Sequence, residues 1–210
     1  MDQLGNLIIE DREIENERFE VVDKNKHYFL GPNLTLRHCT VILKVPASHL
    51  FINQACFIDC MLEVKLELKN FQQWIRAQLK GCRFKGRLVG CDFGHWPGYG
   101  SAPEYQYGSI EDCDFSEAHL NACRFIDCDP LTLRLPRWPY FTILDPIGRA
   151  AELREGRWPS LFGRVLIADL HNDPPATAAA TFHAPTIAKQ LETTPEELRA
   201  VIETFDCILF

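Results

Sequence analysis

The stretch that decides the fold is 108–127, which reads in fives as Gly-Ser-Ile-Glu-Asp, Cys-Asp-Phe-Ser-Glu, Ala-His-Leu-Asn-Ala and Cys-Arg-Phe-Ile-Asp. The third residue of each five is large and apolar, and the first is small. A period of five matches neither the 3.6 residues of an α-helical turn nor the two residues of a flat strand. It predicts a chain that turns a corner every five residues and points two side chains of each five into a narrow tube.

The same five-residue pattern extends toward the N-terminus in a less regular form. The tripeptide Cys-x-Phe occurs at 82–84, 91–93, 113–115 and 123–125, and the step from Phe84 to Leu88 is four residues instead of five. The pattern resembles that of pentapeptide-repeat proteins over about 34–130, with Asp92 and Asp114 at the position where the family usually has Asp or Asn. Arg83, His119 and Arg124 replace that residue elsewhere. The resemblance implies a mainly β fold, an irregular right-handed parallel β-helix.

We expect three parts along the chain. Residues 1–33 are predicted to cap the first coil, because an open β-helix end exposes unpaired backbone groups. Residues 34–135 are predicted to form the β-helix, with a loop at 94–108. Residues 136–210 are predicted to form a C-terminal cap of helical and irregular structure, in which 172–180 is a Pro- and Ala-rich linker.

The C-terminal segment contains one clear helix signal. Thr194-Pro195-Glu196-Glu197 reads as a capping box with proline at the first helical position, and apolar residues follow at helical spacing. This predicts a helix at 195–205. Its apolar face is expected either to cover the end of the coils or to form a homodimer with a second copy.

The composition points to a cytoplasmic protein. The formal net charge of −7 argues against general binding to nucleic acid or to anionic membranes. The first residues lack a basic start followed by an apolar run, and no apolar run approaches the ~18 residues that span a bilayer. We therefore expect neither a nucleic-acid partner nor a membrane partner.

The nine cysteines are predicted to be buried thiols. No Cys-x-x-Cys pair occurs, so the spacing does not favour zinc, and we expect no metal and no cofactor. Most of the cysteines stand two residues before a central apolar position, where a small inward side chain is needed and cysteine behaves as a small hydrophobe. These are Cys39, Cys60, Cys82, Cys91, Cys113, Cys123 and Cys128.

The glycine- and proline-rich text at 94–107 interrupts the repeats and is predicted to be a loop. Aromatic residues with a polar group are enriched at binding hot spots, so this loop is a candidate partner-binding segment. In the alternative interpretation its rings fold back over an irregular coil face. The loop candidates are His95, Trp96, Tyr99, Tyr105 and Tyr107.

Charge is also segregated along the chain. Residues 65–87 contain seven bases and one acid, whereas 109–129 are mainly acidic. An acidic face could capture a basic partner; alternatively, these outward positions are simply solvated. The acidic candidates for partner binding are Glu111, Asp112, Asp114 and Glu117.

The sequence predicts no catalytic residue. Gly81-x4-Gly86 has phosphate-loop spacing, but Arg87-Leu88 stands where Lys and Ser/Thr are required. A loose helix-turn-helix pattern at 187–202 would place Glu196 and Glu197 against phosphate. Carboxylate pairs occur only in charged runs, without an apolar setting that would shift their pKa values.

Three functions remain open at this point. The favoured hypothesis is a non-catalytic, cytoplasmic protein-binding scaffold, specifically a bacterial immunity protein that neutralises a cognate toxin by direct binding. The resemblance also allows a DNA-mimicking protector of a type II topoisomerase, although the basic stretch 65–87 interrupts an acidic stripe. An enzyme on a β-helix scaffold is the third alternative, and it would require a polar cleft.

Overall fold

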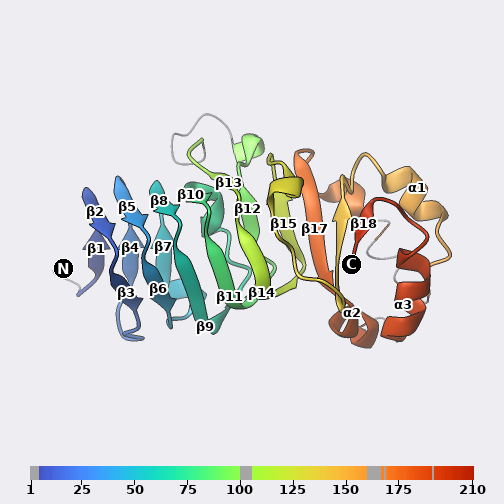
Figure 1. The fold of residues 1–210 in the computed structure, drawn as a ribbon, viewed down its shortest axis with the longest axis horizontal. Coiled ribbons are helices and arrows are strands. Elements are labelled where there is room, and N and C mark those ends of the chain that lie inside the picture. The colour runs from blue at the N-terminus through green and yellow to red at the C-terminus, as the bar shows by residue number, and fades with distance from the viewer. Residues whose placement is uncertain (1–4, 100–105, 160–166, 168, 191) are drawn as a thin grey trace.

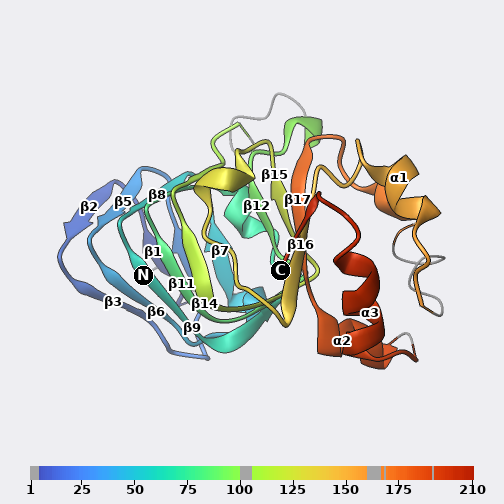
Figure 2. The same ribbon diagram turned by 45° about the vertical axis from the view of Figure 1, so that its right-hand side comes forward.

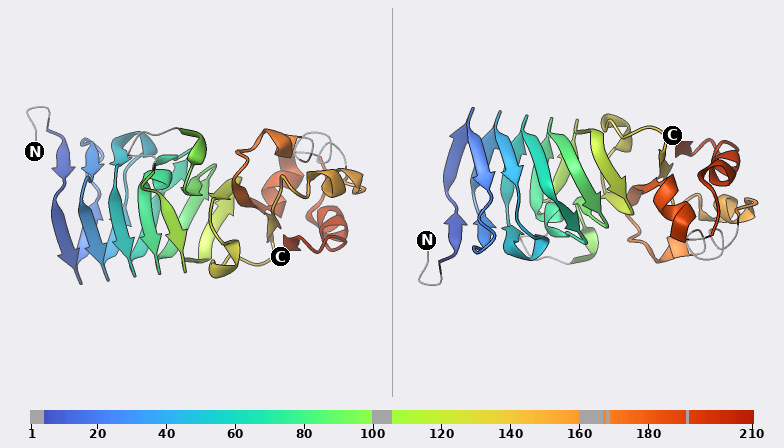
Figure 3. Two further views of the ribbon diagram at one scale, coloured as in Figure 1. Left: turned by 90° about the horizontal axis from the view of Figure 1, so that it is seen from above. Right: turned by 90° about the horizontal axis from the view of Figure 1, so that it is seen from below.

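The computed structural model describes residues 5–99, 106–159, 167, 169–190 and 192–210. The chain forms an elongated stack of short strands, with the N-terminal strands at one end and helices at the other (Figure 1). Views from above and below show the strands side by side along the long axis (Figure 3). The fold is a mainly β solenoid of about four turns, and its stacked coils confirm the parallel architecture predicted from the repeats.

Two five-stranded parallel sheets run along the solenoid (Figure 2). The first contains β2 (Arg12–Glu15), β5 (Leu34–Arg37), β8 (Ala55–Ile58), β10 (Ala77–Lys80) and β13 (Ser109–Glu111). The second contains β3 (Arg18–Val21), β6 (Thr40–Leu43), β9 (Met61–Lys69), β11 (Arg83–Val89) and β14 (Asp114–Asn121). Each coil therefore adds one strand to each sheet.

A third face begins with β1 (Leu7–Ile9), β4 (Tyr28–Leu30) and β7 (Leu50–Ile52), which also pair in parallel. The short 3₁₀ helix η1 (Ala47–His49) leads into β7. In the next coil the 3₁₀ helix η2 (Gln73–Arg76) takes the place of a strand and buries Trp74 completely. Parallel pairing on this face resumes with β12 (Asp92–Gly94) and β15 (Cys123–Ile126).

The interior confirms the two inward positions of each five. Phe115 is fully buried and stacks on Phe84 with ring centroids 4.5 Å apart. Six of the seven repeat cysteines are buried, Cys128 is half-buried, and all nine thiols are free. The Cys82 Sγ lies 3.3 Å from the carbonyl oxygen of Phe57 in the coil before it. Small and bulky residues thus fill the tube together.

Corners between the faces need left-handed backbone. His38, Asp59 and Asp112 have φ values of 51°, 51° and 54°, and Asn, Asp and His adopt this region more readily than most residues. At the step of four between Phe84 and Leu88 the register shifts, because the neighbouring strand β9 has extra residues opposite Gly86–Leu88 of β11. Gly86 has φ 112°, and a Cβ there would clash with the carbonyl of Val64.

The parallel stacking begins at Leu7, within the segment for which we predicted a cap. Strands β1, β2 and β3 pair with β4, β5 and β6, and each is the edge strand of its sheet. The segment lacks the five-residue repeat, but Ile14 and Val21 still provide buried inward side chains. The expected start at residue 34 is therefore too late, because pairing register and inward apolar residues are sufficient for a coil.

The C-terminal segment changes the direction of pairing. β17 (Thr177–His183) pairs antiparallel with β15 and with β16 (Tyr140–Leu144), and β16 pairs antiparallel with β18 (Ile208–Leu209). The linker predicted at 172–180 is therefore wrong in its second half, because 177–180 belong to β17. The alanines of β17 allow it to pack closely between two strands, and Ala179 and Ala180 are almost fully buried.

In the described part of this segment three α-helices accompany the sheet: α1 (Ala150–Glu155), α2 (Ala184–Gln190) and α3 (Pro195–Ile202). The capping box at Thr194 is confirmed, but α3 ends three residues before the predicted end. Further 3₁₀ turns are η3 (Pro97–Tyr99), η5 (Pro130–Thr132) and η7 (Leu170–Asn172). A second hydrophobic core lies here, formed by Phe141, Ile143, Leu153, Ile167, Leu170, Ala180, Phe182, Ala184, Ile187, Ala188, Leu198, Ile202, Phe205, Cys207 and Ile208.

Candidate functional site

The loop predicted to bind a partner folds back onto the solenoid at its described ends. His95 Nδ1 lies 2.9 Å from Asp127 Oδ2, and the Trp96 ring lies 5.5 Å from the guanidinium carbon of Arg124. Tyr107 is half-buried, and burial raises its pKa. Tyr99 ends η3, and Tyr105 lies outside the described residues. The described rings therefore support the alternative interpretation, in which they cover a coil.

The acidic candidates do not form a segregated acidic face. Glu111 Oε2 lies 2.9 Å from Lys80 Nζ of the preceding coil. Glu117 pairs with Lys85 of the preceding coil. Asp114 pairs with Arg134, which follows it in the chain. Asp112 is exposed at the corner before β14. The charges are not segregated on this surface, because coils in parallel register place Lys80 and Lys85 beside the acids of the next coil; acidic capture of a partner stays a prediction.

An apolar ladder that the sequence reasoning missed lies on the third face. We use this name for Ile8, Phe29 and Phe51, which are in register across β1, β4 and β7. Their neighbours Leu30 and Ile52 point into the core, so alternation turns the ladder outward. Phe29 and Phe51 stack with centroids 4.7 Å apart and planes 8° from parallel, and Ile8 is 45% exposed.

The ladder borders a shallow hollow of about 390 Å³. The polar residues Asn6, Glu10 and Asn53 also line it, together with Leu30 and Gly31. Beside the ladder, the rings of His27 and His49 lie 4.4 Å apart. An apolar centre with a polar rim is the arrangement found in protein–protein interfaces.

A signal for the ladder was present in the sequence. The triplets Leu-Ile-Ile, Tyr-Phe-Leu and Leu-Phe-Ile at 7–9, 28–30 and 50–52 each have a large apolar residue at the middle position. In a strand with one face toward solvent, that middle position is normally polar. Three such exceptions at a spacing close to one coil length indicate an outward apolar stripe.

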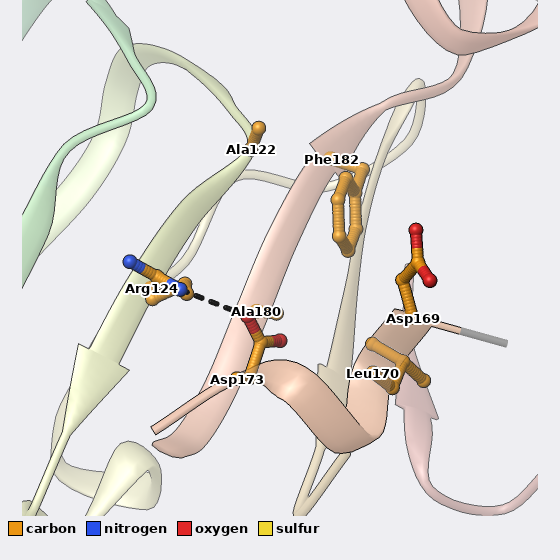
Figure 4. A pocket seen from close by; sticks show the side chains of 7 residues that line it. All are labelled: Ala122, Arg124, Asp169, Leu170, Asp173, Ala180 and Phe182. Carbon is orange, nitrogen blue, oxygen red and sulfur yellow. Dashed lines mark hydrogen bonds and ion pairs between the residues drawn. The ribbon is translucent and has the colours of Figure 1, made fainter. Parts of the chain in front are cut away.

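A pocket of about 350 Å³ lies between β15, η7 and β17 (Figure 4). Leu170, Ala180 and Phe182 provide its apolar wall, and Arg124 and Asp173 meet at its edge. The guanidinium of Arg124 donates two hydrogen bonds of 2.7 and 2.8 Å to the buried Asp92 and one of 2.8 Å to Asp173.

These carboxylates neutralise Arg124, and the hydrogen bond with Asp92 is the main reason that its pKa is raised further. Arg124 therefore joins the C-terminal segment to the solenoid and does not offer an unpaired charge to an anion. Its role in this pocket is structural.

The described residues show no constellation for metal-dependent chemistry. No group of three or more His, Cys, Asp and Glu side chains in this part of the chain could hold a metal ion. Within the same described ranges, no helix has the length and apolar content needed to cross a membrane. The feature of the described surface that most resembles a binding site is therefore the apolar ladder.

Comparison of the sequence with protein-family models and with curated proteins finds no match.

Proposed function

We propose that this protein is a non-catalytic, protein-binding scaffold whose partner docks on the apolar ladder. The single observation that carries the proposal is the outward, in-register stack of Ile8, Phe29 and Phe51. Aromatic side chains at the centre of an interface provide most of its binding energy. Because the ladder is held on paired strands, little conformational entropy is lost when a partner covers it.

Within this class we propose an immunity protein of bacterial type that neutralises a cognate toxin in the cytoplasm. Blocking an active site by occlusion requires a rigid surface and no catalytic residue in the blocking protein. The nine free thiols support a reducing compartment. We also propose that the chain is a pentapeptide-repeat protein with right-handed winding. The period of five residues in 108–127 supports this.

The charge pattern does not favour the topoisomerase alternative. A DNA mimic needs a continuous acidic stripe, whereas here Lys80 and Lys85 alternate with Glu111 and Glu117 across neighbouring coils. A homodimer through α3 is not favoured either. Leu198 and Ile202 are fully buried in the second core of their own chain, so the apolar face of this helix is already covered.

A binding experiment with the product of the neighbouring gene tests the proposal. The wild-type protein and the double variant Phe29→Ser/Phe51→Ser are titrated with that protein in a calorimeter. Two lost hot-spot side chains should weaken binding by about 2–4 kcal/mol, which is about 30- to 1,000-fold in Kd.

The matched control is Gln78→Ser, an outward change on β10 of the neighbouring face that should leave Kd unchanged. Equal affinity of the double variant and the wild type would refute docking on the ladder. Absence of binding by the wild-type protein would count against the proposed toxin partner.

A further inference from the structure

Three aromatic side chains connect the solenoid to the C-terminal sheet at a second place, away from Arg124. His119 lies on β14, Tyr140 on β16 and His183 on β17. The ring centroids of His119 and His183 are 4.6 Å apart, and those of Tyr140 and His183 are 4.9 Å apart. We call these three residues the histidine junction.

Hydrogen bonds fix the histidine junction in place. His119 Nδ1 lies 2.9 Å from Tyr140 Oη, and His183 Nδ1 lies 2.8 Å from Thr186 Oγ1 of α2. The backbone N–H of His183 donates to Asn121 Oδ1 of β14 over 3.1 Å. Tyr140 and His183 are also direct cross-strand partners. The junction thus joins two sheets through a small number of polar side-chain contacts.

The surroundings of the junction oppose positive charge. Burial lowers the pKa of both imidazoles; Arg87 of β11 lowers both further, and His119 also lowers the pKa of His183. Glu67 of β9 raises the pKa of His119, but Glu67 is itself paired with Arg87. Burial raises the pKa of Tyr140, which therefore stays neutral. The junction is built for two neutral imidazoles.

We propose that the histidine junction is an acid-sensitive joint, which opens when His119 and His183 are protonated. Two imidazolium rings would then face each other and Arg87, and like charges at this separation repel. The β15–β17 pairing and the bonds from Arg124 to Asp92 and Asp173 contain no histidine. Opening is therefore local, at the end of β14 and the facing ends of β16 and β17.

The direction of the effect follows from proton linkage. Each imidazole binds a proton less readily in the closed joint than in an open one, where its pKa is about 6.5. The closed joint is therefore fully stable above pH ~6.5 and loses stability as the pH falls below that value. Each unit of pKa depression corresponds to about a tenfold change in the closed-to-open ratio per histidine.

Hydrogen exchange at pH 7.5 and pH 5.0, expressed as protection factors, tests this proposal on the intact protein. Protection should fall by about tenfold or more at acid pH in three segments, while β3 and β6 stay protected. The double variant His119→Gln/His183→Gln should lose this pH dependence. The matched control His38→Asn changes an exposed histidine in left-handed backbone and should retain it. The segments are 117–121, 139–144 and 181–186.

Two results would overturn the proposal: equal protection of the wild-type protein at both pH values, or the same acid-induced loss in the double variant. If the double variant does not fold, NMR titration of the wild-type imidazoles replaces it. Both should titrate below pH ~6.5, and ordinary midpoints would overturn the idea. The ladder lies on β1, β4 and β7 near the N-terminal end of the stack, apart from β14 and β17 (Figure 1), so failure here leaves the binding proposal standing.

Discussion

Replacing Phe115 by alanine should destabilise the protein far more than replacing Phe51, although both residues are phenylalanines on strands. Phe115 is fully buried, stacks on Phe84 at 4.5 Å, and meets Phe93 and Phe125 edge-on at 5.2 and 5.3 Å. A Phe→Ala change in a core removes about 3–5 kcal/mol. Because Phe115 contacts three other rings, we expect about 4 kcal/mol or more.

Phe51 is the matched control for this change. Its ring points outward and has one stacking partner, Phe29, at 4.7 Å. One aromatic pair contributes about 0.5–1.5 kcal/mol, so Phe51→Ala should reduce the free energy of unfolding by about 1 kcal/mol. The two variants should thus differ by about 3 kcal/mol.

Urea unfolding followed by far-ultraviolet circular dichroism measures both losses. A lower midpoint at unchanged slope reports a true change in the free energy of unfolding. Equal losses for the two variants, or a loss under about 1 kcal/mol for Phe115→Ala, would contradict the assignment of inward and outward positions.

The remaining predictions concern thiols, the buried ion pair and the helix cap. At most two of the nine thiols should react rapidly with a thiol reagent in the native protein, because only Cys56 and Cys128 are not fully buried. Burial also raises the pKa of the Cys128 thiol to about 12. Rapid reaction of most thiols would contradict their burial in the core. Asp92→Asn should lower the free energy of unfolding by about 3 kcal/mol, since it leaves Arg124 without its buried partner, and a loss close to zero in urea unfolding would refute that role. Thr194→Ala removes the capping box of α3 and should reduce stability by about 1 kcal/mol in thermal unfolding, whereas Thr194→Ser should change it little.

The periodic parts of the fold were predictable from local sequence. Ile110, Phe115, Leu120 and Phe125 are all buried at the positions that the period of five indicates. The first turn of α3 was predictable as well, because a capping box is a contact between residues three apart. In both cases the decisive information lies within a few residues of the chain.

The surface features were not predictable in the same way, because they join residues one coil apart. Lys80 and Glu111 are 31 residues apart in sequence, yet their side chains pair across β10 and β13. The apolar ladder likewise depends on which residues of successive coils come into register. Irregular steps and loops change the coil length. The strand register must therefore be known before one can tell which outward side chains of successive coils are neighbours.

The C-terminal strands were hidden for a different reason. The alanine-rich sequence of β17 shows no alternation of polar and apolar residues, because both faces of the strand are largely buried. Such a strand resembles a linker in composition. Its antiparallel pairing with β15 and β16 is a tertiary effect that no local pattern announces.

The measurement that tests the central claim most directly is protection of bacterial growth. Cells expressing the product of the neighbouring gene are supplied with the wild-type protein, with Phe29→Ser/Phe51→Ser, or with Gln78→Ser, at matched soluble levels. Our account predicts that the wild type and Gln78→Ser restore growth and that the ladder variant does not. Full protection by the ladder variant would contradict the claim that this protein acts through Ile8, Phe29 and Phe51.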